Sequence, residues 1–328
     1  MNTSDIVIKT KVTLSRNVKG YPFPSKMDDK RASVIASSVF DAINDGNYDL
    51  YNLNQIGEGE INCLIEKGLI TPTLARKNNA SAIIKKNETT SVMINGEDHV
   101  EICVFDGVCD LDSTYDECDK LDDKIEAKLK YAYSEKLGYL TSSPTNAGTG
   151  LHVSVLLFLP GLILTENIKE CRDVMSRINV ALKPVKIKNV EYKYVYELSS
   201  VHTMGVSEKE IVEKIKSALS SVTAYEKKAR DRLLKTNEVA LKDKIMRSYG
   251  TVTNCYRLGI EEMLEALAFV RLGAYYNMLA VSDVSVIDKL CLSMQDNTLA
   301  KSRKARFESA IDRDVYRAQK VVETVKSL

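Results

Sequence analysis

The chain has 328 residues, of which 44% are hydrophobic and 28% are charged, as in ordinary globular proteins. The formal net charge of +1 and the absence of tryptophan argue against a nucleic-acid partner and against binding to a charged membrane surface. A chain of this length can bury a sizeable core and form two or three domains.

The N-terminal residues 1–5 are polar and lead directly into an apolar alternation, so we expect no signal peptide. The longest apolar run, residues 151–164, contains His152 and Pro160 and is too short to span a bilayer. The seven cysteines are scattered singly, which is typical of reduced thiols rather than of a disulfide framework or a zinc site. These features predict a cytoplasmic protein without a metal site.

Alternating apolar residues at 6–14 (I-V-I-K-T-K-V-T-L) predict a β-strand. Residues 31–43 have apolar side chains at helical spacing and predict an amphipathic helix. Shorter strands are expected at 82–84, 91–94 and 99–105. A second helix is expected from Leu121 to Ala132, ending near Gly138.

The apolar run 152–159 could form a buried strand or a helix, and its length does not separate the two. Residues 190–198 alternate as a strand that places its tyrosines on one face. From Ser207 onward nearly all of the chain has helical spacing. Breaks are expected near Gly250, near Gly259 and at 282–286. This change of pattern predicts an α+β domain over residues 1–222, followed by an all-helical domain over residues 223–328.

Residues 138–151 read G-Y-L-T-S-S-P-T-N-A-G-T-G-L and resemble the signature loop of the guanidino kinases, in particular of the bacterial protein arginine kinases. Matches in the same order occur at 5–17, 91–102, 247–255 and 270–273, so the resemblance covers nearly the whole chain. It implies an α+β guanidino-kinase fold, with an antiparallel sheet flanked by helices, followed by an all-helical C-terminal domain.

In that family a phosphoryl group passes from ATP to a guanidinium nitrogen, and the resemblance implies a cage of arginines around the phosphates. Four of those arginine positions carry other residues here. They are Lys11, Thr13, Glu101 and His152. Glu101 reverses the charge at its position, and Phe158 stands where the resemblance places a histidine beside the adenine. The implied phosphate cage is therefore degenerate.

Other catalytic positions are also altered. Arg16 keeps its place in the first motif, and Glu97 matches the carboxylate that orients the guanidinium and accepts its proton. Ser143 replaces the signature-loop cysteine, and Gly96 replaces a second glutamate. The family's glycine-rich loop, which carries a fifth arginine, corresponds to residues 186–193 (K-I-K-N-V-E-Y-K), which are shorter and contain no glycine.

Each charge-assisted hydrogen bond contributes ~1.5–3 kcal/mol, so four or five lost arginine contacts remove on the order of 6–15 kcal/mol. A micromolar complex has only ~8 kcal/mol in total, so even half of this loss would abolish useful binding. The sequence therefore predicts a pseudokinase with no cofactor, acting as a regulator or adaptor. Its expected partner is a phosphoarginine-bearing protein, an active arginine kinase or a protease complex. The alternative is a divergent active phosphotransferase in which Lys11 and His152 hold Mg-ATP more weakly.

Residues 311–318 (I-D-R-D-V-Y-R-A) resemble a family segment that contributes an allosteric phosphoarginine pocket. The resemblance implies that Arg313 binds the phosphoryl oxygens and that Asp314 accepts guanidinium N–H groups. The alternative is a helix N-terminus, where Asp312 and Asp314 favour the dipole and Arg313 is solvated. The family also self-associates, which implies a homodimer, although the apolar stripe of the helical domain is more typical of a core. The stripe comprises Met263, Leu264, Leu267, Val270 and Leu272.

Three further features carry simpler interpretations. Residues 110–119 are rich in carboxylates, but they lack the glycine and terminal glutamate of a calcium loop and are expected to open the following helix. His99 is expected to be a hydrogen-bonded structural histidine, and His202 has no carboxylate or cysteine at ligand spacing.

Overall fold

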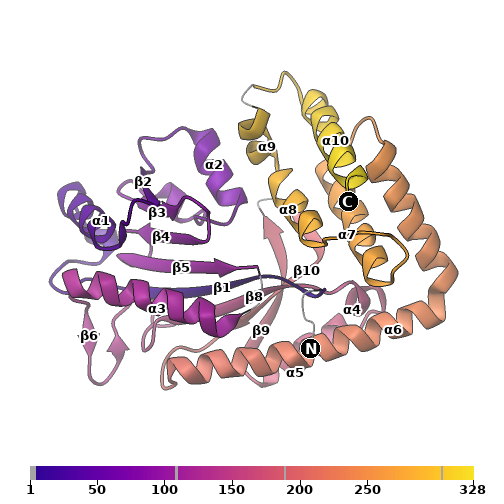
Figure 1. Cartoon of the computed structure of the whole chain (residues 1–328). Helices are drawn as coiled ribbons and strands as arrows, with labels where there is room; N and C mark the ends of the chain where they lie inside the picture. Colours follow the sequence, from indigo (N-terminus) through magenta and orange to yellow (C-terminus); the bar gives the residue numbers. More distant parts are fainter. Residues whose placement is uncertain (1–4, 108–109, 188–189, 304–305) are drawn as a thin grey trace.

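The computed structural model describes residues 5–107, 110–187, 190–303 and 306–328. An antiparallel sheet forms its centre, with helices on both faces (Figure 1). In Figure 1, helix α3 and the first half of α6 run across the near side of the sheet, and helices α7 to α10 gather at the upper right. The expected α+β architecture followed by a helical region is confirmed.

The eight-stranded sheet has the order β2-β3-β4-β5-β1-β8-β10-β9, and the neighbouring strands are antiparallel. Its strands are β1 (Val7–Arg16), β2 (Tyr48–Asn52), β3 (Ser81–Lys85), β4 (Thr90–Ile94), β5 (Val100–Asp106), β8 (Leu151–Phe158), β9 (Val180–Ile187) and β10 (Val190–Ser200). Strand β1 is central and pairs with both β5 and β8. The run 152–159, left open between strand and helix, is therefore a strand.

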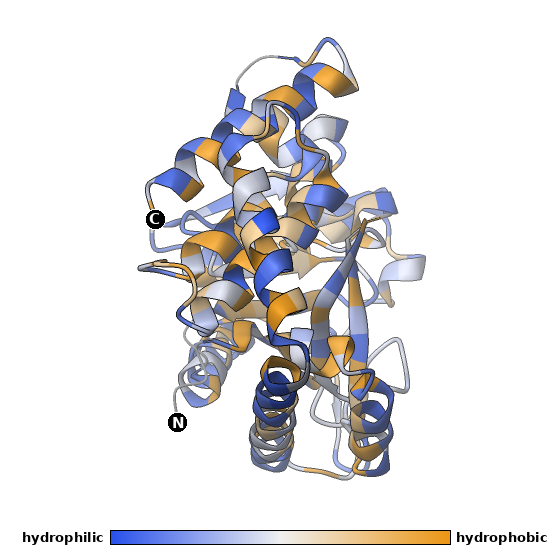
Figure 2. Cartoon of the chain, turned by 90° about the vertical axis from the view of Figure 1, so that its right-hand side faces the viewer, coloured by the Kyte–Doolittle hydropathy of each residue, from blue (hydrophilic) through white to orange (hydrophobic). Residues whose placement is uncertain are grey.

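One face of the sheet builds the largest apolar core. Val12, Leu14 and Val153 point from this face into a cluster of buried side chains. The helices that complete the cluster are α1 (Asp29–Ile43), α3 (Leu111–Lys128), α4 (Pro160–Leu164), α5 (Ile168–Arg177) and the first half of α6 (Glu208–Asn254). In Figure 2, hydrophobic residues gather where helices meet the sheet, as burial of apolar area requires.

Among the described residues, helices cover the second face of the sheet at its two ends. Helix α2 (Glu58–Glu66) packs at the β2–β4 end, beside the short turn η2 (Leu74–Arg76). A further short turn, η1 (Pro24–Lys26), follows β1 in the chain. At the other end lie α7 (Ile260–Tyr275), α8 (Ser285–Ser293), α9 (Asp296–Arg303) and α10 (Ala310–Lys326). The apolar stripe from Met263 to Leu272 is buried in this helical part, so it belongs to the core of the chain.

Helix α6 begins with a capping box between Ser207 and Glu210 and continues to Asn254. The expected break near Gly250 is wrong, because a single glycine costs only about 1 kcal/mol in a helix and tertiary packing offsets it. The helix instead kinks at Asn237, where φ is −136° and ψ is 33°. The proposed domain boundary at residue 222 lies inside this helix and stays a prediction.

Helix α3 ends at Lys128, well before Gly138, near which the sequence predicted its end. Leu129 is extended, and the backbone N–H of Lys19 then donates to the carbonyl of Lys130 at 2.8 Å, which draws the chain toward β1. The small hairpin β6 (Tyr133–Ser134) and β7 (Gly138–Tyr139) follows.

A register shift in β10 between Tyr192 and Tyr196 breaks the simple alternation of this strand. Tyr192 and Tyr194 pack with the helical part of the chain, whereas Tyr196 packs against the core of the first face. The expectation that these tyrosines share one face is therefore wrong.

The two ends of the second face are joined through Glu66. Its carboxylate accepts hydrogen bonds from the backbone N–H groups of Asn297 (3.0 Å) and Thr298 (2.8 Å) at the start of α9. Burial alone would raise the pKa of Glu66, but the hydrogen bonds from Asn297 and Thr298 outweigh it and hold the pKa below its ordinary value. The carboxylate therefore stays ionised at the positive end of a helix dipole.

Arg317 of α10 is fully buried and holds the helical part together. Its Nε donates to the carbonyl of Met294 at 3.0 Å and its Nη1 to the carbonyl of Leu258 at 3.0 Å. It also pairs with the carboxylates of Asp314 and Asp296, each at 2.6 Å.

Replacing this guanidinium, as in Arg317→Met, leaves two buried carbonyls without their donor and removes the nearer of the two partners of the buried Asp314 carboxylate. We expect the free energy of unfolding to fall by about 3–5 kcal/mol, as when one partner of a buried ion pair is removed. Urea denaturation followed by circular dichroism measures the loss. Lys320→Met on the exposed side of the same helix is the control, with a change within about 0.5 kcal/mol. Equal stability of the two variants would contradict the assigned role.

Candidate functional site

Arg16 holds the signature loop against the end of β1. Its Nε and Nη2 donate to Oδ2 of Asp122 at 2.9 and 2.7 Å, and its Nη1 donates to the carbonyl of Thr149 at 2.7 Å. The guanidinium carbon also lies 3.6 Å from the ring centre of Tyr139, at cation–π distance. Only 1% of Arg16 is exposed, so this arginine positions the loop from inside the protein.

Glycines allow the loop to approach β1 this closely. Gly150 has φ of +65°, and a Cβ at this position would lie 2.5 Å from the carbonyl oxygen of Ser15. Gly148 has φ of +101°, and a Cβ there would lie 2.4 Å from the carbonyl oxygen of Thr203. Both positions therefore need glycine for backbone conformation and for space.

Asp98 joins the loop to two other motifs. Its Oδ1 accepts hydrogen bonds from the side-chain amide of Asn17 and from the backbone N–H of Ser142, each at 2.6 Å. Asn17 in turn accepts from the backbone N–H of His99 at 3.0 Å. The structure thus brings together three motifs that are far apart in the sequence.

His99 is fully buried beside this network. Its Nδ1 accepts from the backbone N–H of Val18 at 2.9 Å, and its Nε2 lies 2.9 Å from the carbonyl of Pro22, to which it donates as the neutral tautomer. The prediction of a structural histidine is confirmed.

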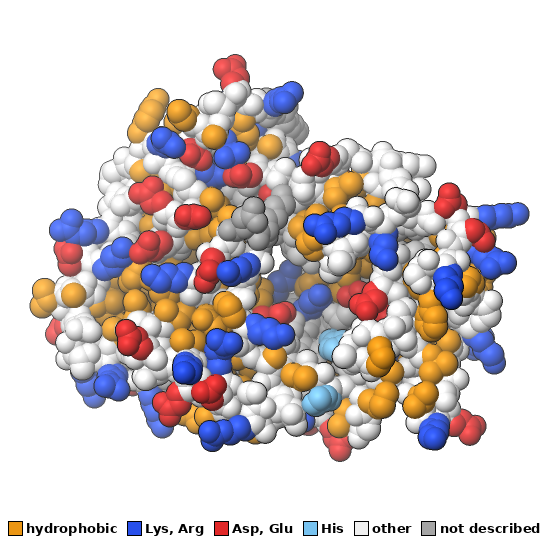
Figure 3. Space-filling view, turned by 180° about the vertical axis from the view of Figure 1, so that it is seen from behind, with side chains coloured by type: hydrophobic (Ala, Val, Ile, Leu, Met, Phe, Trp, Pro, Cys, Tyr) orange, Lys and Arg blue, Asp and Glu red, His pale blue; other side chains and the backbone are white. Residues whose placement is uncertain are grey.

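The altered phosphate-cage positions Lys11, Thr13, Glu101 and His152 all lie on the second face of the sheet. The register sets Thr13 between Cys103 on β5 and His152 on β8. Figure 3, seen from behind, shows a hollow near the centre of the molecule with blue and red side chains and pale-blue histidine at its edge. Positive and negative side chains therefore share this region.

These four positions carry little positive charge. The Nε2 of His152 donates to Oδ1 of Asn146 at 2.9 Å. Burial together with the charge of Lys11 lowers the pKa of His152 from 6.5, so the ring is neutral at pH 7. Thr13 is uncharged and its hydroxyl lies 3.6 Å from the sulfur of Cys103. Lys11 is the one cation of the four, and Glu101 opposes it.

Cys103 and Glu197, which the sequence did not single out, belong to the same environment. Cys103, Glu101 and Glu197 together raise the pKa of Lys11, whereas its burial acts in the opposite direction. Burial raises the pKa of Glu101, and Lys11 lowers it. No motif marks Cys103 or Glu197; only the pairing of strands places them here.

Glu97 and Ser143 are not joined by a hydrogen bond among the described residues. Glu97 is exposed in the turn between β4 and β5, and it is the neighbouring Asp98 that contacts the loop. Ser143 is half-buried, and its hydroxyl lies 2.7 Å from that of Thr145. Their catalytic roles stay predictions.

The region matched to the glycine-rich loop is a strand hairpin. Strand β9 ends at Ile187 and β10 begins at Val190, so Lys188 and Asn189 of the predicted short connection lie outside the described residues. Phe158, at the position where the resemblance places an adenine contact, is 3% exposed. The guanidinium carbon of Arg271 lies 4.5 Å from the centre of the Phe158 ring.

Arg313 and Asp314, the expected phosphoarginine ligands, both have partners within the chain. Asp314 pairs with Arg317 at 2.6 Å and with Arg257 at 3.3 Å, and the Nε of Arg313 lies 3.1 Å from Asp296. A ligand at this place would have to exchange with these pairs. The ligand role of Arg313 and Asp314 stays a prediction.

At the acidic segment 110–119, Asp110 caps α3 and accepts from the backbone N–H of Ser113 at 3.0 Å, as expected for a helix opening. Within the described ranges, no group of three His, Cys, Asp or Glu side chains is arranged to hold a metal ion. None of the described helices has the length and apolar character needed to cross a membrane.

The buried His99 predicts acid sensitivity. Burial lowers its pKa from 6.5, so the unfolded chain binds this proton more readily, and stability is lost as the pH falls below about 6.5. In His99→Gln, the free energy of unfolding should depend less on pH between pH 7.5 and 5.5, with a slope smaller by up to about 1.4 kcal/mol per pH unit. Urea unfolding at several pH values measures this slope. The exposed His202→Gln is the control and should keep the parent slope. An unchanged slope in His99→Gln would refute the assignment.

Comparison with known proteins identifies the family. Residues 31–229 match the ATP:guanido phosphotransferase C-terminal catalytic domain, and residues 238–328 match the protein-arginine kinase McsB C-terminal domain. The protein-arginine kinase of Caldanaerobacter subterraneus subsp. tengcongensis is 34% identical over 326 residues, which cover 97% of this chain and 96% of the relative. That of Bacillus subtilis is 31% identical over 328 residues, covering 98% and 90%.

A solved lombricine kinase has a TM-score of 0.61 at 18% identity and covers 68% of this chain and 67% of that chain, a likeness that concerns the fold. The guanidino-kinase fold expected from the sequence is thereby confirmed. Since the catalytic-domain match takes in more than half of the chain and full-length relatives exceed 30% identity, the chain belongs to the protein-arginine kinase family.

Proposed function

We propose that this chain is a pseudokinase of the protein-arginine kinase family, which acts by binding a partner and does not transfer phosphate. The observation that carries the proposal is the charge of Lys11, Thr13, Glu101 and His152 on the second face of the sheet. Lys11 and Glu101 offset each other, Thr13 is uncharged, and His152 is neutral at pH 7.

The argument is electrostatic. Phosphoryl transfer requires donors that balance the charge of the nucleotide phosphates and of the transition state. Arginines supply that charge as bidentate donors, which a lysine or a neutral imidazole cannot imitate. Glu101 adds a carboxylate that would repel a polyphosphate in the same space.

In this proposal the chain binds a phosphoarginine-bearing protein, a kinase or a protease. The support for this role is the segment around Arg313 and Asp314, where guanidinium and carboxylate groups alternate at the start of α10. A phosphoarginine side chain offers the complementary pair, a phosphoryl dianion and a guanidinium. Association as a homodimer through the helical part is a further expectation of this proposal.

The second candidate is an active protein-arginine phosphotransferase that uses Mg-ATP. The relatives favour this candidate over the first, because relatives that match nearly the whole chain are protein-arginine kinases. Lys11 and His152 would then be the weaker phosphate ligands.

Phosphorus NMR separates the two candidates. With Mg-ATP and an arginine-rich protein substrate, we expect no phosphoarginine signal from this chain, while the Bacillus subtilis protein-arginine kinase serves as the positive control. Phosphoarginine formation that is lost in Lys11→Met would refute the pseudokinase and establish the second candidate. Under the pseudokinase proposal, Thr13→Arg, Glu101→Arg and His152→Arg combined should instead raise the Mg-ATP affinity at least about tenfold, because they restore charged donors.

Phosphoarginine recognition is tested separately by titrating a phosphoarginine peptide into the full chain. We expect Arg313→Ala to weaken binding at least about tenfold, since a charged donor to the phosphoryl group is lost. Lys320→Ala, on the same helix, should leave the affinity unchanged. The absence of binding by the parent chain, or equal affinity in Arg313→Ala, would remove this ligand from the proposal.

A further inference from the structure

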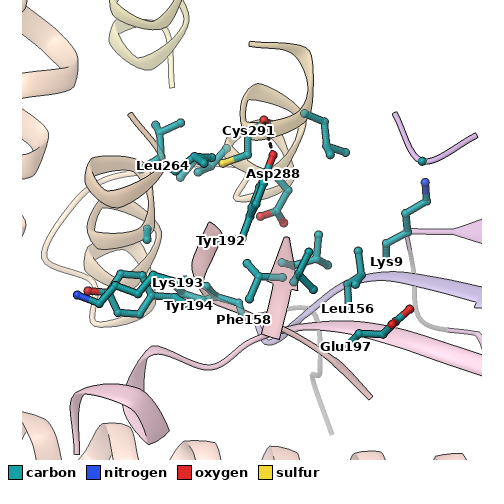
Figure 4. Close-up of a pocket in the computed structure, with 18 of the residues that line it drawn as sticks. Lys9, Leu156, Phe158, Tyr192, Lys193, Tyr194, Glu197, Leu264, Asp288 and Cys291 are labelled. Atoms are coloured by element: carbon teal, nitrogen blue, oxygen red, sulfur yellow. Dashed lines mark hydrogen bonds between the residues drawn. The ribbon is translucent and has the colours of Figure 1, made fainter. Parts of the chain in front are cut away.

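A cavity of about 750 Å³ lies between the second face of the sheet and helices α7 and α8. Strands β1, β8 and β10 form one side, and the residues Glu66, Lys67 and Gly68 at the end of α2 form one edge. Figure 4 shows side chains from the strands and from the two helices facing this space. Its volume is in the range of small-molecule sites.

The middle of the cavity is apolar. Leu156, Phe158 and Tyr194 face it from the strands, and Leu264 and Leu267 face it from α7. Such a surface gains free energy when it covers an aliphatic or aromatic body and gives a strongly hydrated ligand few partners.

Lys9 supplies a positive charge on the strand side. Its Nζ lies 3.9 Å above the ring centre of Phe105, and Lys11 stands two residues along on the same face of β1. Among the described residues, neither lysine has a carboxylate within ion-pair distance, 4.0 Å. A partly buried ammonium group without a counterion is unfavourable, and an anionic ligand would relieve it.

The environment of Lys9 agrees with this geometry. Burial, followed by the charge of Lys11, lowers the pKa of Lys9 to about 8, while Glu88 and Cys103 act in the opposite direction. Glu88 is itself ion-paired with Lys67. Lys9 is therefore mainly protonated at pH 7 and loses its charge as the pH rises through 8.

The other charges limit the ligand to a single negative charge. Five basic and six acidic side chains line the cavity among the described residues. Arg271 is already paired with Asp288 at 3.0 Å, and Glu191 and Glu197 flank the strand side. Glu191 is paired with Lys186 at 3.2 Å, but Glu197 has no ion-pair partner among the described residues. A polyphosphate would therefore meet the carboxylate of Glu197, whereas one carboxylate at Lys9 would not.

We propose that this cavity binds a small amphipathic monoanion, with its carboxylate at Lys9 and its aliphatic or aromatic body against Leu156, Phe158 and Leu264. This inference goes beyond the proposed function, because its anchoring charge is Lys9. The cavity also takes in Lys11 and Phe158, so a nucleotide and the monoanion would compete for the same space.

Calorimetric titration with decanoate and with decanol tests the site, because the two share a body and differ in charge. We expect decanoate to bind once per chain and at least about tenfold more tightly than decanol, as one charge-assisted contact allows. Lys9→Met should remove this preference. Decanoate affinity should also fall from pH 7 to pH 9 as Lys9 deprotonates, while decanol affinity stays constant.

Two further variants complete the test. Lys67→Met removes a cavity-lining lysine that is already paired with Glu88 and should change decanoate affinity less than about twofold. Ala268→Trp fills the space beside α7 and should abolish binding of both ligands. Circular dichroism checks the fold of each variant; if Lys9→Met is unfolded, the two ligands and Ala268→Trp decide the outcome. No decanoate binding, equal affinity for both ligands, or full binding by folded Ala268→Trp overturns the proposal, and none of these results bears on the phosphoarginine measurement.

Discussion

The guanidinium of Arg16 is the contact on which the candidate site depends. It joins the central strand to α3 through Asp122 and to the signature loop through the carbonyl of Thr149. Removing one partner of such a buried pair costs about 3–5 kcal/mol, so this contact constrains the fold whatever the site binds. The signature loop is therefore placed by an internal ion pair and by the close approach of Gly150 to β1, and its shape does not require a nucleotide.

This arrangement separates the family's architecture from its chemistry. The fold needs Arg16, Asp98 and the glycines, whose contacts hold the signature loop in place. Phosphoryl transfer needs positive charge on the second face of the sheet, where this chain has Lys11 opposed by Glu101. The first set of residues accounts for the family assignment, while the second set motivates the proposal of a pseudokinase.

Much of the fold could be predicted from the sequence, because the apolar pattern marked β1, β3, β4 and β5 and the resemblance implied an antiparallel sheet flanked by helices. The register shift in β10 could not be predicted, since the residue types at 190–198 alternate without interruption. Gly250 suggested a break that packing overrides. The motif marked Asp314 as a ligand but could not reveal that Arg257 and Arg317 already bind it. The cavity joins β1, β8, β10, α7 and α8, so no local pattern could predict it.

The contact between Glu66 and the start of α9 has a kinetic consequence. Residues 66 and 297 are separated by 231 positions in the chain, yet their hydrogen bonds close one edge of the cavity. The width of that edge is thus set by these hydrogen bonds rather than by a connecting loop. Local opening of these hydrogen bonds would widen that edge, so the exchange of a molecule inside would depend in part on the motion between the sheet and the helical part of the chain.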